Sequence, residues 1–335
     1  IRRGCTSLGS ASCTRWPRDR EPRELGDSQV PRHFLDLTDL TGDEATALLR
    51  EAQSLKSDWR RGLRPPLLAG RTLGLIFEKP SLRTRVSFET AIVQLGGGAL
   101  FLNSKDVGFD GREPIADISR VVSRYLDVLA LRTYQHETLT RMASFASIPI
   151  INALSDESHP CQAMADMLTI AEVFGELRGR TVVFVGDGNN VARSLAEASA
   201  LLGANFVLSC PPGYEFPPSF LERFQQRFPE PARRPRLIID PREAVREADV
   251  IYTDVWASMG QESESERRRA DFASYQVDES LFAEAHPDAI FLHCLPAHRG
   301  EEVTDEVLDG PRSRVLDQAE NRMHFQKALL TWLVS

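Results

Sequence analysis

The sequence predicts an α/β protein made of two doubly wound parallel-sheet domains joined by helices. Three observations predict this class. Apolar strand-like runs alternate with helical segments along most of the chain, which is the pattern of parallel sheets covered by helices. The length of 335 residues suits about two cores. No apolar run reaches the roughly 18 residues of a membrane span.

In the first half, order is expected to begin near His33. Apolar residues recur at helical spacing over 36–56, and Thr41 with Glu44 forms a plausible capping box at the start of that helix. The further elements of this half are expected, in chain order, at 71–77 (strand), 84–95 (helix, ended by the glycines at 96–98), 128–131 (strand), 137–145 (helix) and 148–152 (strand).

A long helix over 160–176 joins the two halves. It begins with Pro160, where the missing N–H does no harm. The elements of the second half are expected at 181–185 (strand), 192–202 (helix), 205–208 (strand), 250–253 (strand), 289–292 (strand) and 319–333 (helix). No internal repeat interrupts this series.

Residues 1–32 differ from the rest of the chain. The first eighteen are rich in arginine and serine and contain no acid, the composition of a mitochondrial transit peptide. A leader or disordered extension is favoured, because the segment is short and lacks an amphipathic pattern.

The five cysteines are few, odd in number and widely spaced, without zinc-ligand spacing, which indicates a reducing compartment. We therefore expect a cytoplasmic protein, or a mitochondrial matrix protein if the leader is a transit peptide. The net charge of −8 argues against nucleic acid as a partner.

The segment 77–85 is the first motif that carries chemistry. A strand ends, Pro80 breaks it, and a helix starts at Ser81 or Leu82. Free N–H groups and the helix dipole attract an anion there, and Arg83 and Thr84 add side-chain donors for phosphate oxygens. An N-cap serine beside surface arginines is the structural alternative.

Two further candidates follow strands of the first half. Arg132 lies at a strand end, where ligands of parallel sheets bind, although a lone arginine is often a surface ion-pair partner. His159 and Gln162 are three apart at the start of the long helix, so both can face one ligand. The helix dipole favours a neutral imidazole at His159, which can donate to a polarised carbonyl.

The turn 186–190 has two interpretations. It follows a strand and contains Gly186 and Gly188, which suggests a dinucleotide site. The third glycine position is Val191, however, and no acid follows at the expected distance. A tight turn that presents Asn190 is favoured.

The last motifs follow strands of the second half. Asp254 begins a segment that continues into a polar loop long enough to act as a lid. His293 and Cys294 end another strand, and the alternation of strand side chains argues against a Cys–His catalytic pair. Arg322 opens the closing helix and has no chemical signal of its own.

Taken together and in this order, these motifs resemble the aspartate/ornithine carbamoyltransferase family from about His33 to the C-terminus. Ser258-Met259-Gly260 combined with His293-Cys294-Leu295-Pro296 resembles its ornithine branch. The resemblance implies transfer of the carbamoyl group of carbamoyl phosphate to the δ-amine of L-ornithine, giving L-citrulline and phosphate in arginine biosynthesis. It implies a homotrimer or a multiple of trimers, and neither metal nor organic cofactor.

The resemblance also implies domains and site residues. A carbamoyl phosphate-binding domain is expected at 33–155, an ornithine-binding domain at 156–318, and a helix that returns to the first domain at 319–335. The implied catalytic residues are Arg132, His159, Cys294 and Asp254. The implied carbamoyl phosphate-binding residues are Ser81, Leu82, Arg83, Thr84, Arg132, His159, Gln162, Cys294, Leu295 and Arg322. The implied ornithine-binding residues are Leu154, Asn190, Asp254, Ser258 and Met259.

Two positions depart from the family pattern. Leu82 stands where the phosphate loop of the family usually has threonine. A larger residue at this position resembles the relatives that use acetylornithine or succinylornithine. Near Gly108 the chain lacks the Gln or His that many ornithine enzymes lend to a neighbouring subunit. The alternatives left open are another acceptor, a nicotinamide-dependent enzyme or non-catalytic nucleotide-binding protein built on the Gly186 turn, and a regulatory homologue.

Overall fold

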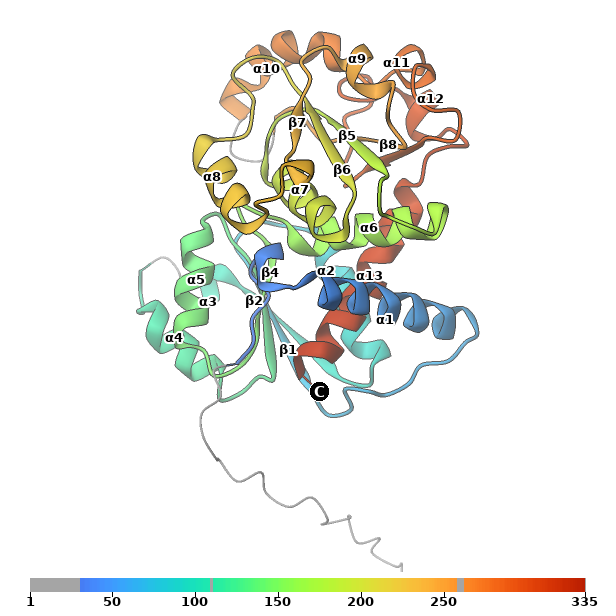
Figure 1. Ribbon diagram of the computed structural model, residues 1–335. Coiled ribbons are helices and arrows are strands. Elements are labelled where there is room, and N and C mark those ends of the chain that lie inside the picture. Colours follow the sequence, from blue (N-terminus) through green and yellow to red (C-terminus); the bar gives the residue numbers. More distant parts are fainter. Residues whose placement is uncertain (1–30, 109–110, 258–261, 335) are drawn as a thin grey trace, which may run out of the picture. The chain divides into compact units, whose positions relative to one another are not determined.

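Two parallel sheets form the framework of the computed structural model, which describes residues 31–108, 111–257 and 262–334. The first sheet has the strand order β2-β1-β3-β4 and the second β7-β6-β5-β8-β9 (Figure 1). Every pairing between neighbouring strands of these sheets is parallel. The fold class predicted from the sequence is confirmed.

The first sheet and its helices occupy the first half of the chain. Its strands are β1 (Thr72–Phe77), β2 (Gly98–Asn103), β3 (Val128–Arg132) and β4 (Ile150–Leu154). Its helices are α1 (Gly42–Arg60), α2 (Leu82–Gln94), α3 (Ser104–Val107), α4 (Ile115–Val122) and α5 (His136–Phe145), preceded by the 3₁₀ turn η1 (Leu37–Asp39). Helix α6 (Pro160–Phe174) then leads into the second half.

The second sheet is built from shorter strands and more helices. Its strands are β5 (Thr181–Val185), β6 (Asn205–Ser209), β7 (Arg236–Leu237), β8 (Val250–Thr253) and β9 (Ile290–His293). Its helices are α7 (Asn190–Leu202), α8 (Pro218–Arg227), α9 (Pro241–Val245), α10 (Ser265–Phe272), α11 (Glu279–Ala283) and α12 (Asp305–Leu308), with 3₁₀ turns η2 (Pro231–Arg233), η3 (Glu262–Glu264) and η4 (Ala273–Tyr275). Helix α13 (Val315–Val334) closes the chain.

Side chains of β5 show why the second sheet is doubly wound. Val182 and Phe184 belong to one buried apolar cluster, while Val183 and Val185 belong to another. Successive strand residues point to opposite faces, so both faces of this strand are covered. A strand buried on both faces becomes a continuous apolar run, which is how it was recognised in the sequence.

The capping box expected at the start of α1 is present. The Thr41 backbone N–H donates to the Glu44 carboxylate at 2.8 Å, and the Glu44 N–H donates to Thr41 Oγ1 at 3.2 Å. Because each residue satisfies an N–H of the other, the helix starts at a position that local sequence fixes.

Two strand expectations were wrong. The strand expected at 148–152 lies at Ile150–Leu154, since Pro149 has no N–H to donate to a ladder. Gly98 does not simply end a helix but begins β2, which forms the edge of the first sheet. The strand contains an apolar run at 99–102 that was not assigned to a strand in the sequence, and it is only partly buried.

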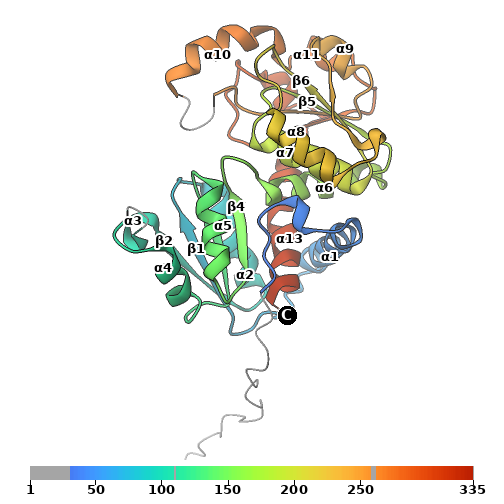
Figure 2. The same cartoon turned by 60° about the vertical axis from the view of Figure 1, so that its left-hand side comes forward.

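Helix α13 packs against α1, α2 and α6 and touches β3 and β9. Figures 1 and 2 show it alongside α1. The return of the closing helix to the first half is thus confirmed, although the helix begins at Val315 rather than at 319. The domain boundaries at 155 and 318 stay a prediction. Within the described ranges, no helix is both long and apolar enough to cross a membrane.

Candidate active site

A cavity of about 530 Å³ lies where the carboxyl ends of β1, β3, β4, β8 and β9 meet the starts of α2, α6 and α7 and the first half of α13. Most of the residues predicted for the site line it. They are Ser81, Leu82, Arg83, Thr84, Arg132, Leu154, His159, Asn190, Asp254, Cys294, Leu295 and Arg322. The cavity thus combines strand ends from both sheets, as the rule for ligand sites in parallel sheets requires.

The turn between β1 and α2 has the features of an anion site. Ser81 is the N-cap of α2, and its Oγ accepts a hydrogen bond from the Thr84 N–H at 3.3 Å. The first turn of the helix therefore presents N–H groups to the cavity. Thr84 is buried and its Oγ1 accepts a hydrogen bond from Arg322 at 2.5 Å. Leu82 is 75% exposed, so the hydroxyl absent at this position is replaced by an apolar group at the rim.

Two guanidinium groups face the same space, of which Arg322 is buried and Arg132 half-buried. Burial lowers the pKa of Arg132 to about 10, and the nearby charges of Arg322 and Arg83 act in the same direction. Burial likewise lowers the pKa of Arg322. The Nε atoms of Arg132 and Arg322 are both buried without a hydrogen-bond partner. A site that desolvates two cations and leaves donors unpaired is completed by a bound anion.

His159 is the N-cap residue of α6 and is 4% exposed. Burial, with help from Arg322 and Arg132, holds its pKa well below the usual value, so the imidazole is neutral. The sequence argument predicted the neutral form from the helix dipole. The larger causes are burial and two guanidinium groups, which sequence spacing does not reveal. Its Nδ1 has no partner, while its backbone N–H donates to Ser194 Oγ at 2.9 Å.

Asp254 and Cys294 form the opposite side of the cavity. The Cys294 thiol donates to Asp254 Oδ1 at 3.1 Å, and Asn189 Nδ2 donates to Asp254 Oδ2 at 3.0 Å. Burial and the adjacent Asp254 charge raise the pKa of Cys294 well above its usual value. Cys294 is therefore a protonated thiol, and Asp254 is a carboxylate held by donors from two different loops.

Asn190 lines the cavity, but its amide is engaged within the chain. Nδ2 donates to the Ser155 carbonyl at 2.7 Å, and Oδ1 accepts from the Val191 N–H at 3.0 Å. The Nδ2 group carries two hydrogens, so it can keep the Ser155 carbonyl and still donate to the substrate carboxylate that the sequence suggested.

No hydrogen bond between His293 and Cys294 occurs among the described contacts. Ligand atoms of His293, Cys294 and Asp254 nevertheless lie within 4.8 Å of one another, because strand alternation ends at His293. The His293 Nδ1 accepts from the Leu295 N–H at 2.8 Å, and Nε2 lies 3.2 Å from Glu302. Leu295 has φ 57, a left-handed conformation that non-glycine residues seldom adopt.

Three predicted residues are not placed on the wall. Gln162 is buried behind it and donates to Asp166 Oδ1 at 2.8 Å, so it does not line the cavity. Ser258 and Met259 lie outside the described residues. The wall also includes residues that sequence reasoning did not propose, namely Lys79, Pro80, Val191, Val255, Ala257, Pro296 and His298. Lys79 precedes the anion-binding turn directly, and that position was the available signal.

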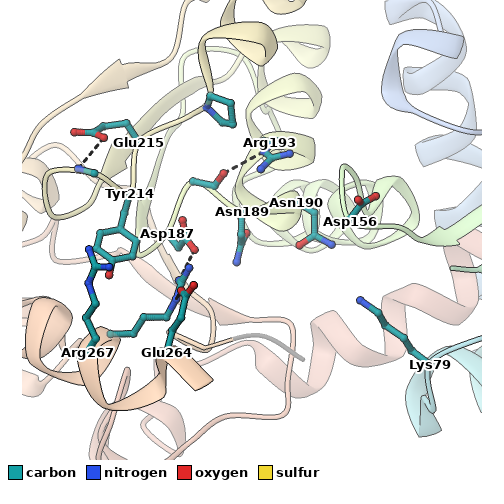
Figure 3. Close-up of a pocket in the computed structure, with 14 residues that line it drawn as sticks. Lys79, Asp156, Asp187, Asn189, Asn190, Arg193, Tyr214, Glu215, Glu264 and Arg267 are labelled. Atoms are coloured by element: carbon teal, nitrogen blue, oxygen red, sulfur yellow. Dashed lines mark hydrogen bonds and ion pairs between the residues drawn. The ribbon is translucent and has the colours of Figure 1, made fainter. Parts of the chain in front are cut away.

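A second, polar cavity of about 500 Å³ adjoins the first and shares Lys79 and Asn190 with it (Figure 3). The turn after β5 forms one side. A Cβ at Gly188 would lie 2.8 Å from the backbone of Glu215, so close packing requires this glycine. That observation supports the tight-turn interpretation of 186–190.

Helix α10 borders the second cavity through Arg268, which is buried. Its guanidinium pairs with Asp187 at 2.7 Å and with Glu264 at 3.0 Å, and donates to the Trp256 carbonyl at 3.0 Å. One side chain therefore connects both ends of the predicted lid segment to the turn after β5. Residues 258–261 of that segment lie outside the described residues.

The fold and the site define a two-domain parallel-sheet protein with an anion-binding helix start opposite a carboxylate-bearing strand end. Comparison with known proteins agrees. The family model described as "Aspartate/ornithine carbamoyltransferase, carbamoyl-P binding domain" matches residues 32–172. The family model described as "Aspartate/ornithine carbamoyltransferase, Asp/Orn binding domain" matches residues 178–333. The chain belongs to the aspartate/ornithine carbamoyltransferase family.

Individual relatives are similar over most of their length. "Ornithine carbamoyltransferase" of Thermococcus kodakarensis is 51% identical, covering 90% of this chain and 96% of the relative. "Ornithine carbamoyltransferase, anabolic" of Pyrococcus furiosus is 52% identical with the same coverage. The solved structure of ornithine carbamoyltransferase from Pyrococcus furiosus has a TM-score of 0.86 at 51% identity, covering 90% of this chain and 96% of that one. The structure from Thermus thermophilus has a TM-score of 0.82 at 44% identity, covering 92% and 100%.

Proposed function

We propose that this protein transfers the carbamoyl group of carbamoyl phosphate to the δ-amine of L-ornithine, giving L-citrulline and phosphate for arginine biosynthesis. The observation that carries the proposal is the set of buried, unpartnered polar atoms around one cavity: Arg132 Nε, His159 Nδ1 and Arg322 Nε. A small anion with a carbonyl group satisfies such a set. The names of the similar enzymes support the same reaction.

The phosphate is proposed to bind at the start of α2. Ser81, Leu82, Arg83 and Thr84 surround the free N–H groups there, and Leu82 contributes its backbone N–H despite lacking a hydroxyl. Charge-assisted hydrogen bonds from a guanidinium group are about twice as strong as neutral ones, so Arg83 and Arg132 supply much of the affinity.

The carbonyl is proposed to lie among Arg132, His159 and Thr84. As the amine attacks the carbonyl carbon, negative charge grows on the carbonyl oxygen, and these donors stabilise it. The C–O bond to phosphate then breaks and phosphate leaves with its electron pair. Arg322 and Leu295 lie beside the carbamoyl amino group, and Gln162, which is buried behind the cavity wall, reaches that group after a shift of its side chain. This chemistry requires neither metal nor organic cofactor, since guanidinium groups supply the electrophilic assistance.

Ornithine is proposed to bind on the side of Asp254. The carboxylate pairs with the α-ammonium, Asn190 donates the second hydrogen of its Nδ2 to the α-carboxylate, and Leu154 packs on the methylene stem. Ser258 and Met259 complete this side. The δ-amine must lose a proton before it attacks. Cys294 is itself protonated in its buried setting, so it orients the amine and the leaving phosphate takes the proton.

Self-association, as a homotrimer or a multiple of trimers, is proposed from the surface of the first half. Exposed apolar side chains lie on α2 and on the edge strand β2, namely Leu82 (75% exposed), Val86 (51%), Val93 (60%) and Leu100 (51%). An apolar face beside an unpaired strand edge is a common site of protein contact. Light scattering coupled to gel filtration tests the trimer, and a monomeric mass contradicts it.

The acceptor screen is the decisive experiment. Carbamoyl phosphate is supplied with ornithine, acetylornithine, succinylornithine, aspartate or putrescine, and both phosphate release and the carbamoylated product are measured. Stoichiometric citrulline with ornithine is expected, and turnover with each other acceptor at least about a hundredfold lower. Faster turnover of acetylornithine or succinylornithine would mean that Leu82, not Asp254, indicates the acceptor.

A further inference from the structure

Behind the cavity, two glutamine amides converge on one buried carboxylate. Gln162 Nε2 donates to Asp166 Oδ1 at 2.8 Å, and Gln318 Nε2 donates to the same oxygen at 2.7 Å. Asp166 is fully buried, and its second oxygen has no partner in the described chain. The carboxylate thus joins α6 to α13 at a point that the proposed chemistry does not use.

Gln318 is held in place by contacts with two strands, β8 and β9. Gln318 Oε1 accepts the His293 backbone N–H at 2.9 Å, so its amide cannot turn without losing that bond. Its Nε2 also lies 3.1 Å from the Tyr252 hydroxyl. Gln318 is therefore held with its NH₂ toward Asp166 by strand backbone, independently of any substrate.

The hydrogen bond between Gln162 and Asp166 determines which atom of the Gln162 amide is free to contact a ligand. An ionised carboxylate only accepts hydrogen bonds, so the Gln162 amide must present its NH₂ to Asp166. Its Oε1 is consequently turned away from Asp166, and it is buried without a partner. Gln162 follows His159 by three positions, which places both on one face of α6. His159 lines the cavity and Gln162 lies behind its wall, so Gln162 Oε1 meets a ligand there only after its side chain shifts toward the cavity.

We propose that Asp166 is a positioning residue for carbamoyl recognition: it fixes the Gln162 amide so that Oε1 accepts a hydrogen bond from the carbamoyl NH₂. The reversed amide would present NH₂ to NH₂ and lose the contact. The inference rests on the proposed function, because it requires a carbamoyl group at Gln162. It adds a source of specificity: the site distinguishes a carbamoyl group from an acyl group of the same shape.

Asp166 titrates near neutrality in this setting. Burial raises its pKa to about 7, against the lowering effects of hydrogen bonds from Gln162, Gln318 and Tyr252 and of the Arg322 charge. These are the groups that face it from α6, α13 and β8. Below its pKa the neutral acid can donate, and the Gln162 amide is then free to turn. Carbamoyl selectivity should therefore decline as the pH falls from 8 to 6.

The test compares two ligands that differ in one group. Carbamoyl phosphate carries NH₂ where acetyl phosphate carries CH₃, and titration calorimetry at pH 8 gives the ratio of their dissociation constants. Asp166→Ala and Gln162→Ala should each reduce the preference for carbamoyl phosphate by roughly three- to tenfold, the effect of one hydrogen bond. Asp166→Asn, like the neutral acid, has both a donor and an acceptor, so it should show a reduced preference that does not change with pH.

Thr169→Val is the matched control, since Thr169 is a buried hydroxyl on the same helix that accepts from Asn321 at 2.9 Å. It should leave the ratio unchanged. Equal weakening of carbamoyl phosphate, acetyl phosphate and inorganic phosphate in Asp166→Ala would indicate a structural role only and overturn the proposal.

If Asp166→Ala does not fold, the pH profiles of wild type and Asp166→Asn decide. A wild-type ratio that is constant from pH 6 to 8 overturns the proposal, and a decline absent from Asp166→Asn supports it. Citrulline formation by the wild type is measured in parallel. Its absence would refute the proposed function, whereas citrulline formation with an unaltered ratio in Asp166→Ala would refute only the role of Asp166.

Discussion

Arg322 on the closing helix donates a hydrogen bond to Thr84 on the first turn of α2 at 2.5 Å, across 238 positions of sequence. Both side chains are buried, and both line the cavity. The contact makes the last helix part of the anion-binding turn. The two side chains proposed to recognise phosphate and carbamoyl groups are therefore in direct contact, and substitutions of either should affect ligand binding before they affect the fold.

Arg83→Ala should weaken carbamoyl phosphate binding by about tenfold or more. The substitution removes charge-assisted hydrogen bonds but only a partly buried side chain, so the melting temperature should change little. Calorimetric titration measures the affinity, and Arg141→Ala on the exposed face of α5 is the control. An affinity within a few-fold of wild type would show that Arg83 does not hold the phosphate.

His159→Ala should lower turnover by about a hundredfold and change the apparent binding constants much less. The neutral imidazole is proposed to stabilise charge that develops only during attack on the carbonyl. Steady-state kinetics separate the two parameters, with His286→Ala on the surface as the control. A large rise in the Michaelis constant with unchanged turnover would contradict the electrostatic role.

Asp254→Asn should reduce the efficiency with ornithine by about a hundredfold or more while leaving carbamoyl phosphate affinity nearly unchanged. The amide loses the charge that pairs with the α-ammonium but can retain hydrogen bonds to Asn189 and Cys294. Because these groups already partner Asp254, an acetylated acceptor leaves it without a cation but not without hydrogen bonds. Asp317→Asn, on an exposed position of α13, is the matched control. An equal decrease in the efficiency with ornithine and in the affinity for carbamoyl phosphate would indicate a structural defect.

Arg268→Ala should raise the Michaelis constant for ornithine and leave carbamoyl phosphate binding unaltered. The guanidinium connects α10 and the Trp256 carbonyl to Asp187, and removing it leaves a largely buried carboxylate unpaired. The control is Arg269→Ala, because the Arg269 side chain is exposed.

In the wild type, carbamoyl phosphate should bind first and both ligands together should protect 256–266 from proteolysis. Random addition in product-inhibition kinetics, or protease sensitivity unaffected by ligands, would contradict this order and closure.

The free energy of unfolding should depend on pH through Asp166. Its pKa is raised from 3.8 to about 7 in the folded protein, so the folded state binds the proton more tightly than the unfolded state. The contribution of this group to stability is intact below about pH 4, falls as the pH rises through the range up to about 7, and is constant above it. The total loss is at most about 4 kcal/mol.

Asp166→Asn removes this titration. Urea denaturation between pH 4 and 8 should therefore show the variant gaining stability relative to wild type as the pH rises. Parallel stability curves for the two proteins would show that Asp166 does not titrate in this range.

The sequence by itself determined the parts of this protein that depend on local chemistry. Ser81 caps α2, Pro160 begins α6, and Arg132 and Asp254 follow buried strands. In parallel sheets the carboxyl ends of strands share one edge, so residues at strand ends could be grouped into a site without knowing the packing. The resemblance of the same motifs to one family then supplied their chemical roles.

Only the tertiary structure decided the state of those residues. The neutrality of His159 comes from burial beside Arg322 and Arg132, which lie on other elements. The orientation of the Gln162 amide depends on Asp166, which depends in turn on Gln318 in the closing helix. The edge position of β2 was also not predicted, and its apolar run at 99–102 was not assigned to a strand. Burial, hydrogen-bond partners and edge position result from contacts between distant segments, and local spacing does not encode them.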